Sequence, residues 1–115
     1  MIRKQSLYLH DIKNAIESIL NFTSGMTFES FRADDRTFSA VIRKIEIIGE
    51  AAKSIKPEIQ ASNPDIPWSV LARMRDKLIH GYFGIDADII WKTVNNDLPE
   101  ILPVISSLCD KYKDN

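Results

Sequence analysis

One stretch of the sequence holds a dense cluster of side chains that could do acid–base or phosphate chemistry. It runs from residue 73 to residue 82 and reads RMRDKLIHGY. A histidine with its unperturbed pKa of about 6.5 can take or give a proton near neutrality, and an arginine is a permanent cation with donors that fit a phosphate. Arg73, Arg75 and Lys77 outnumber Asp76, so the stretch is locally positive. The pattern indicates a site that meets a negatively charged group.

Asp76 and His80 form the candidate acid–base pair. They are four residues apart, which places them on one face of a helix. The carboxylate could hold one imidazole nitrogen and leave the other available for proton transfer. We therefore interpret Asp76 as the group that orients His80. A histidine at the C-terminal end of a helix also complements the helix dipole, and that structural alternative stays open.

Arg75 and His80 would not converge in a regular helix, because five residues at about 100° each leave them about 140° apart. A glycine at position 81 would let His80 leave helical geometry, and a second copy of the chain would bring an arginine and a histidine together across a dimer interface. We expect both. The alternative for Arg75 is a structural ion pair, for which Glu46 and Glu50 are the candidate partners.

The elements that would position these side chains are helices. Apolar residues recur at steps of three and four, which predicts helices over residues 2–22, from a cap at position 34 or 35 to about 56, from 67 to about 80, and from 86 almost to the end. Residues 57–67 are rich in proline and turn formers and predict a short connection. Asp86 is better explained as a helix cap than, with Asp88, as a metal ligand. Pro99 and Pro103 predict a kink or a restart near Asp97.

A glycine in the middle of the second predicted helix needs an explanation. Gly49 lies in the run IIGEAAK at residues 47–53 and costs about 1 kcal/mol relative to alanine. Close approach of another helix would offset this cost, and the neighbour could belong to the same chain or to a second copy. Glu46 and Glu50, on the same helix, could be solvated or bonded to Arg75.

Length and composition fit one helical domain. The chain has 115 residues, 13.1 kDa, 15 basic and 16 acidic side chains, and a net charge of -1. This balance excludes a histone-like polycation, so nucleic-acid contact would need a local patch. No alternating strand pattern of useful length appears. We predict an all-α fold, an antiparallel bundle of four or five helices, in a single domain over residues 1–115.

Cysteine use and hydropathy indicate a cytoplasmic protein. Cys109 is the single cysteine, so no internal disulfide can form, and with His10 and His80 far apart in sequence no zinc-site spacing is present. No apolar run approaches the roughly 20 residues that cross a bilayer, and charges interrupt the first helix. We expect no membrane association, no metal and no cofactor.

The motif and its surroundings resemble a known family. Arg75, His80 and Tyr82 fit the pattern R-x4-H-x-Y. The phrases FRAD at residues 31–34, IIGEAAK at 47–53 and DLP at 97–99 also match, so the resemblance covers nearly the whole chain. The sequence is similar to the HepT-like toxins of the DUF86 group in the HEPN superfamily.

This resemblance implies a helical homodimer that cleaves RNA without a metal and acts as the toxin of a toxin–antitoxin pair. It implies that Arg75 and His80 are catalytic and that Asp76 accompanies them at a position where the group often has asparagine. It also implies that a cognate nucleotidyltransferase antitoxin modifies Tyr82 with AMP. The chain itself lacks the Gly-Ser and paired-Asp pattern of a nucleotidyltransferase and would be its target.

Two functions fit these residues. In the first, His80 moves a proton at the ribose 2′-hydroxyl or the leaving oxygen while Arg75 stabilises the charge on the phosphate, which restricts the enzyme to RNA. In the second, the chain is a non-catalytic helical module that uses the same side chains to bind a nucleotide or a partner nucleotidyltransferase. Cleavage of RNA distinguishes the two.

Overall fold

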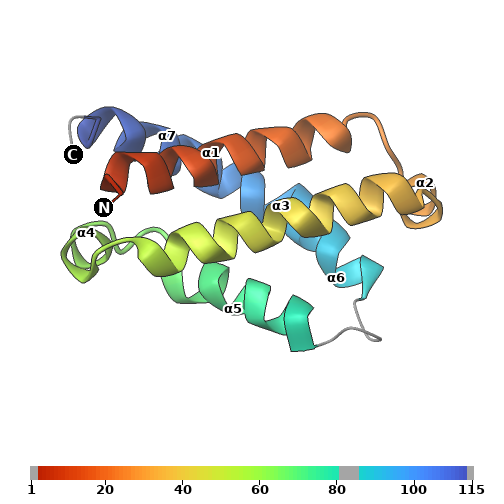
Figure 1. Cartoon of the computed structure of the whole chain (residues 1–115). Coiled ribbons are helices and arrows are strands. Elements are labelled where there is room, and N and C mark those ends of the chain that lie inside the picture. The colour runs from red at the N-terminus through yellow and green to blue at the C-terminus, as the bar shows by residue number, and fades with distance from the viewer. Residues whose placement is uncertain (1–2, 81–85, 114–115) are drawn as a thin grey trace.

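The computed structural model describes residues 3–80 and 86–113, and for residues 76–80 it describes the backbone alone. All regular structure in those ranges is helical, which confirms the predicted all-α fold (Figure 1). The elements in chain order are α1 (Gln5–Phe22), α2 (Phe28–Ala33), α3 (Asp35–Ser54), α4 (Pro57–Ser62), α5 (Trp68–His80), α6 (Ala87–Lys92), the π-helical segment η1 (Thr93–Asp97) and α7 (Leu98–Lys111).

The long helices form an antiparallel bundle, as the sequence predicts. Figure 1 shows α1 and α3 side by side in opposite directions, with α5 packed along α3 and the α6–η1–α7 rod returning along α1. These four rods correspond to the four predicted helical segments. The short helices α2 and α4 lie at opposite ends of the bundle.

The two short helices were not predicted, and α4 corrects the expectation of a purely turn-rich connection after residue 57. Each has six residues, which is too short to show a periodic apolar pattern. Pro57 opens α4 at a position where the missing N–H costs nothing. Thr27 opens α2 through a capping box in which Thr27 and Ser30 each accept a hydrogen bond from the other's backbone N–H.

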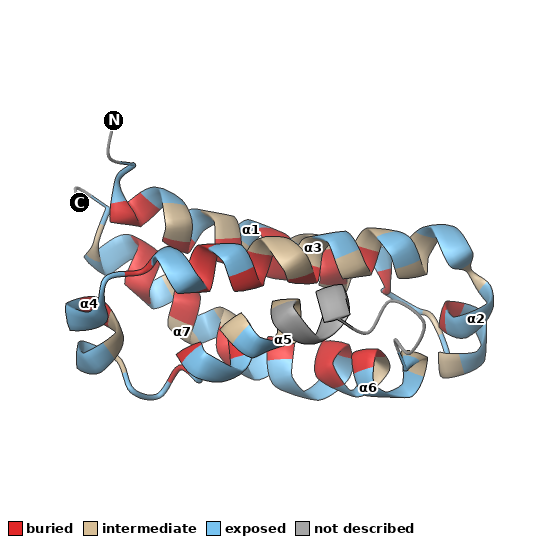
Figure 2. Cartoon of the chain, turned by 60° about the horizontal axis from the view of Figure 1, so that its bottom comes forward, coloured by how far each residue is buried: buried red, intermediate tan, exposed pale blue. Residues whose placement is uncertain are grey.

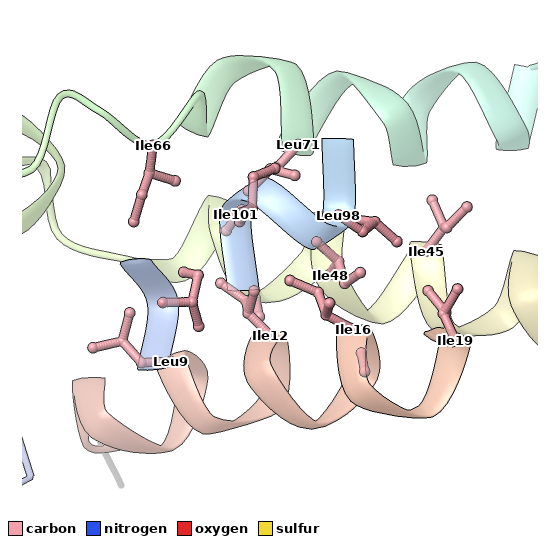
Figure 3. Close-up of a cluster of buried hydrophobic side chains, with 14 of the residues drawn as sticks. Leu9, Ile12, Ile16, Ile19, Ile45, Ile48, Ile66, Leu71, Leu98 and Ile101 are labelled. Atoms are coloured by element: carbon pink, nitrogen blue, oxygen red, sulfur yellow. The ribbon is translucent and has the colours of Figure 1, made fainter. Parts of the chain in front are cut away.

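The apolar stripes of the long helices meet in one core. Figure 3 shows branched aliphatic side chains from α1, α3, α5 and α7 pointing into the space between these helices. Fully burying such a side chain stabilises the fold by about 1.5–3 kcal/mol. Figure 2 shows the complementary pattern, with exposed positions on the outer faces of the bundle. Labelled members of the core are Leu9, Ile12, Ile16, Ile19, Ile45, Ile48, Ile66, Leu71, Leu98 and Ile101.

The last rod changes geometry where the prolines predict it. The chain continues from α6 into five π-helical residues, Thr93–Asp97, and returns to α-helix at Leu98. Pro99 would clash with the carbonyl group four residues before it in a regular α-helix, and the wide turn covers that residue, Asn95. The predicted kink near Asp97 is therefore a π-bulge.

α3 and α5 approach each other closely at Gly49, as the mid-helix glycine predicts. A Cβ atom added at Gly49 would lie 2.3 Å from Cβ of Arg75 and 3.2 Å from the carbonyl oxygen of Leu71. Both of these atoms belong to α5 of the same chain, so the neighbour left open by the sequence is intramolecular. The absence of a side chain at Gly49 sets the distance between α3 and the segment of α5 that carries Arg75.

Hydropathy along the helices bears on the expected lack of membrane association. Within residues 3–80 and 86–113, no helix combines the length and the apolar character needed to cross a membrane.

Replacing the N-cap of α3 tests a pH-dependent part of the stability. Asp34 accepts hydrogen bonds from the backbone N–H of Thr37 (3.0 Å) and from its hydroxyl group (2.8 Å), and these bonds hold the pKa of Asp34 below its usual value. The stabilisation is therefore present above the unfolded pKa of about 3.9 and lost as the pH falls through the lower folded pKa. Asp34→Asn should lower Tm by a few degrees at pH 7, measured by circular dichroism.

The difference in Tm between the wild type and Asp34→Asn should shrink towards zero as the pH falls below the folded pKa of Asp34. The aspartate is then protonated and resembles asparagine. A Tm difference that stays constant from pH 7 to pH 2.5 would contradict an ionised cap.

Filling the contact between α3 and α5 should destabilise the fold. Gly49→Ala places a methyl group against Cβ of Arg75, where overpacking costs about 1–3 kcal/mol. The better helix propensity of alanine returns about 1 kcal/mol. We expect a net loss of about 1 kcal/mol, or about 4 °C in Tm. Ser39→Ala, at an exposed position of α3, is the matched control and should not lower Tm. Equal Tm values for the two variants would exclude the close approach.

Candidate functional site

Arg75 lies at the contact between α5 and α3 and is held by Glu50. Nη2 of Arg75 is 2.6 Å from Oε1 of Glu50. The side chain of Arg75 is 29% exposed and that of Glu50 is 59% exposed, so the guanidinium is partly enclosed while its partner faces solvent. The sequence named Glu46 and Glu50 as candidate partners, and the described ion pair is with Glu50.

Glu46 makes a different contact. Its Oε2 atom is 3.4 Å from Nη1 of Arg43, three residues earlier on α3. The side chain of Arg43 is 70% exposed. This distance and this exposure describe a weak surface pair, of the kind that contributes at most about 1 kcal/mol.

Two neighbouring residues of α3 together fix Arg75. Gly49 lets the backbone of α5 come close enough to place Cβ of Arg75, and Glu50 binds the far end of the same side chain. A long side chain that is held at both ends loses much of its rotamer freedom before any ligand binds. Donors that are already oriented in this way are the kind that stabilise charge developing on a substrate.

Arg75 lines a polar cleft of about 430 Å³ that extends across α3 to the N-terminal end of α1. We call it the arginine cleft. Its charged lining residues are Arg3, Asp11, Arg43, Glu46, Glu50 and Arg75, and Tyr8 lies beside Arg3. It therefore combines three guanidinium groups with three carboxylates and one aromatic ring.

The α1 end of the arginine cleft has its own ion pair. Nη1 of Arg3 is 2.5 Å from Oδ2 of Asp11, and the guanidinium carbon of Arg3 lies 4.8 Å from the ring centroid of Tyr8. The hydrogen bond to Asp11 raises the pKa of Arg3 above its already high value. Arg3 is therefore a cation at every physiological pH.

A second hollow, of about 470 Å³, lies between α5 and the start of α7 and has the opposite character. Its lining is mostly apolar and includes Val70 and Met74, with three acidic residues, Asp65, Asp97 and Glu100. Its described lining includes no lysine or arginine. Because acidic groups repel phosphate, the arginine cleft is the better place for an anionic substrate.

His80, Asp76 and Tyr82 complete the sequence motif but lie partly or wholly outside the described residues. The backbone is helical through His80, whereas the side chains of Asp76 and His80 and all of Tyr82 are not described. Residue 81 and the side chain of His80 lie outside the described part of the chain, so the expectation that His80 swings out ahead of Gly81 stays a prediction. At the level of the backbone, Arg75 and His80 keep the 140° separation of a regular helix.

The other residues considered from the sequence have structural roles where they are described. Asp86 caps α6 by accepting a hydrogen bond from the backbone N–H of Asp88, as predicted. Cys109 is a free, buried cysteine, and burial raises the pKa of its thiol, which makes it a weak nucleophile. Among the residues that the structure describes, no three His, Cys, Asp or Glu side chains gather as a metal site requires.

Sequence reasoning missed the part of the arginine cleft that lies away from α5. Arg3, Tyr8 and Asp11 belong to the first segment, and Arg43 belongs to α3. Their spacing contains one weak signal, since Tyr8 and Asp11 are three residues apart and share a helix face. Nothing in the sequence says that this face meets α3 beside Arg75.

Comparison with known proteins gives the family. The ribonuclease HepT-like family matches residues 12–108. A Thermococcus cleftensis protein named "Probable ribonuclease HepT" is 52% identical over 101 residues, which cover 88% of this chain and 92% of the relative.

Two further relatives come from other organisms. A Methanocaldococcus jannaschii protein named as a "Putative RNase" is 44% identical over 88% of this chain and 84% of its own length. A protein of Caldanaerobacter subterraneus with the same kind of name is 38% identical over 92% of this chain and 95% of its own length. No solved structure matches the chain significantly. The family match and the extent of these similarities confirm the resemblance read from the motif: the chain belongs to the ribonuclease HepT-like family.

Proposed function

We propose that this protein is a metal-independent ribonuclease and the toxin of a toxin–antitoxin pair whose antitoxin is a nucleotidyltransferase. The observation that carries the proposal is the placement of Arg75, which Gly49 and Glu50 hold at a cleft lined by further cations. The family to which the chain belongs, and the names of its relatives, support RNA cleavage as the chemistry. The motif residue His80 follows Arg75 on the same helix.

The reaction proposed for His80 is proton transfer during attack of a ribose 2′-oxygen on the adjacent phosphorus. The 2′-oxygen forms a bond to phosphorus, the bond to the 5′-oxygen breaks, and the products are a 2′,3′-cyclic phosphate and a 5′-hydroxyl. One imidazole takes the proton of the 2′-hydroxyl or returns a proton to the 5′-oxygen, which typically gives a 10²- to 10⁴-fold acceleration. DNA lacks the attacking group and is not a substrate.

Arg75 and Asp76 have supporting roles in this reaction. The guanidinium of Arg75 stabilises the extra negative charge on the pentacoordinate phosphorus, and its value lies in being oriented before the reaction begins. Asp76, four residues before His80, orients the imidazole. Neither step needs a metal ion.

A homodimer follows from the separation between the two motif residues. Because the backbone of α5 stays helical through His80, Arg75 and His80 of one chain start from different sides of the helix. Two copies packed through this region would bring an arginine and a histidine to one phosphodiester. We therefore place the active site between subunits.

Regulation would act on Tyr82, two residues after His80. An AMP group transferred to its hydroxyl by the partner antitoxin adds a phosphate and considerable bulk beside the imidazole. Substrate phosphate would then be repelled and sterically blocked. Inhibition follows without any change of fold.

Removing either motif side chain should abolish cleavage. Arg75→Ala and His80→Ala should each lower the rate of cleavage of total RNA at least 100-fold, because they remove charge stabilisation and proton transfer respectively. The measurement is gel analysis of RNA in the presence of EDTA, and the wild type should remain active there.

Two control variants make the same substitutions at other surface positions. Arg36→Ala and His10→Ala remove an exposed arginine and an exposed histidine and should cleave at the wild-type rate. All five proteins should sediment as dimers at micromolar concentration. Full activity of either motif variant excludes the proposed reaction, and a monomeric wild type excludes the shared site.

The non-catalytic module remains the competing function, because the ion pair between Arg75 and Glu50 is also what a structural arginine would make. The non-catalytic function would be supported if the purified protein binds nucleotide but leaves RNA intact, both with and without EDTA.

Incubation with the partner nucleotidyltransferase and ATP should attach AMP to Tyr82. Mass spectrometry of the peptide that contains Tyr82 should show one or more added AMP units, and the modified protein should no longer cleave RNA. Tyr82→Phe is the control, since it lacks the acceptor hydroxyl and should stay unmodified and active in the same mixture. AMP on a different residue would contradict this regulation.

A further inference from the structure

The arginine cleft extends well beyond the residue that the proposed reaction uses. Arg43 on α3 and Arg3, just before α1, line the same cleft as Arg75 on α5, so three segments far apart in the sequence each bring one guanidinium to one cleft. The ring of Tyr8 lies beneath the guanidinium of Arg3. Tyr8 is half-buried. Guanidinium groups that follow a groove, together with an aromatic ring on which a base can stack, are how proteins hold a single strand of RNA.

The carboxylates in the cleft do not prevent such binding. The pair between Arg43 and Glu46 is long, at 3.4 Å, and the Arg43 side chain is 70% exposed. Arg3 and Asp11 are 40% and 36% exposed at their side chains. Exposed pairs of this kind are weak, so each guanidinium can exchange its carboxylate for a phosphate at little cost.

We propose that the arginine cleft binds the single-stranded RNA that flanks the scissile phosphate, with Arg43 and Arg3 on phosphates and Tyr8 stacked on a base. This inference rests on the proposed ribonuclease function, because Arg75 marks the end of the cleft at which the cut falls. It adds a substrate class, an extended single strand, and three binding residues outside the family motif.

Because the charges in the cleft are paired, substitutions of the two members of a pair should change RNA affinity in opposite directions. Three guanidiniums and three carboxylates leave the cleft without net charge. RNA phosphates therefore replace Asp11 at Arg3 and Glu46 at Arg43, while Glu50 stays on Arg75. Removing the cation of a pair should weaken binding, whereas neutralising the anion of the same pair should strengthen it. A purely structural ion pair has no such opposite effect, because either change breaks it.

The experiment measures binding without cleavage. A fluorescein-labelled twelve-nucleotide oligouridylate with 2′-O-methyl riboses lacks the attacking hydroxyl, and its Kd is read from fluorescence anisotropy at low salt. Arg43→Ala and Tyr8→Ala should each raise Kd about tenfold, as expected for one phosphate contact or one stacked base. Glu46→Gln and Asp11→Asn should lower Kd about threefold.

Matched controls come from α7. Lys111 places its ammonium 5.3 Å from the ring centroid of Tyr112, and it lies outside the cleft, as does the neighbouring acid Asp110. Lys111→Ala and Asp110→Asn should leave Kd within twofold of the wild type. Thermal melts should show that all six variants are folded, because each replaces a side chain that is partly or fully exposed.

The outcomes separate this inference from the proposed function. Equal shifts of Kd for Arg43→Ala and Lys111→Ala, or a change in the same direction for both members of one pair, would overturn the cleft as an RNA site. Altered sedimentation with unchanged Kd would instead assign this surface to contact between subunits and overturn it too. If only the proposed ribonuclease function is wrong, the wild-type protein will leave RNA uncut, while the opposite shifts in Kd for the two members of a pair will persist.

Discussion

The contact between Gly49 and the backbone of α5 is the constraint from which the candidate site follows. A hypothetical Cβ atom on Gly49 would lie 2.3 Å from Cβ of Arg75, far inside the distance at which two carbon atoms can pack. Because Gly49 has no side chain, α3 and α5 pack closely at Arg75, the arginine of the sequence motif. The next residue, Glu50, then reaches the guanidinium. Gly49 therefore sets the spacing between the helices, and Glu50 supplies the negative charge that holds the Arg75 side chain.

The charge balance of the arginine cleft bears on the proposed binding of RNA by a chain without net positive charge. The charge of the whole chain is -1, and the cations of the arginine cleft are each accompanied by an acid. In the proposed binding mode, such a cleft attracts polyanions weakly at long range, and phosphates take the place of the carboxylates on Arg3 and Arg43. Affinity then depends on the spacing of phosphates along a strand more than on total charge. This is a source of selectivity that a lysine-rich patch does not offer.

The sequence was most informative where a pattern is local. Apolar periodicity predicted the long helices, the prolines predicted the irregularity at η1, and the N-cap at Asp34 was one of the two candidates. The six-residue helices α2 and α4 were missed because fewer than two turns carry no period. For the site, the sequence offered Glu46 and Glu50 as candidate partners of Arg75, and the structure pairs Arg75 with Glu50. The contribution of Arg3, Tyr8 and Arg43 could not, because it depends on how α1 packs beside α3 and no single segment contains that information.

The packing of α3 against α5 suits the role proposed for Arg75. Arg75 is fixed by α3 from both ends of its side chain, which matches the need of charge stabilisation for donors that do not reorganise. His80 lies five residues later on α5, whose described backbone is helical from Trp68 through His80. The role proposed for His80 is to take a proton from one oxygen and to deliver one to another. The motif therefore spaces the arginine and the histidine five residues apart along one helix, and the packing of α3 fixes the arginine.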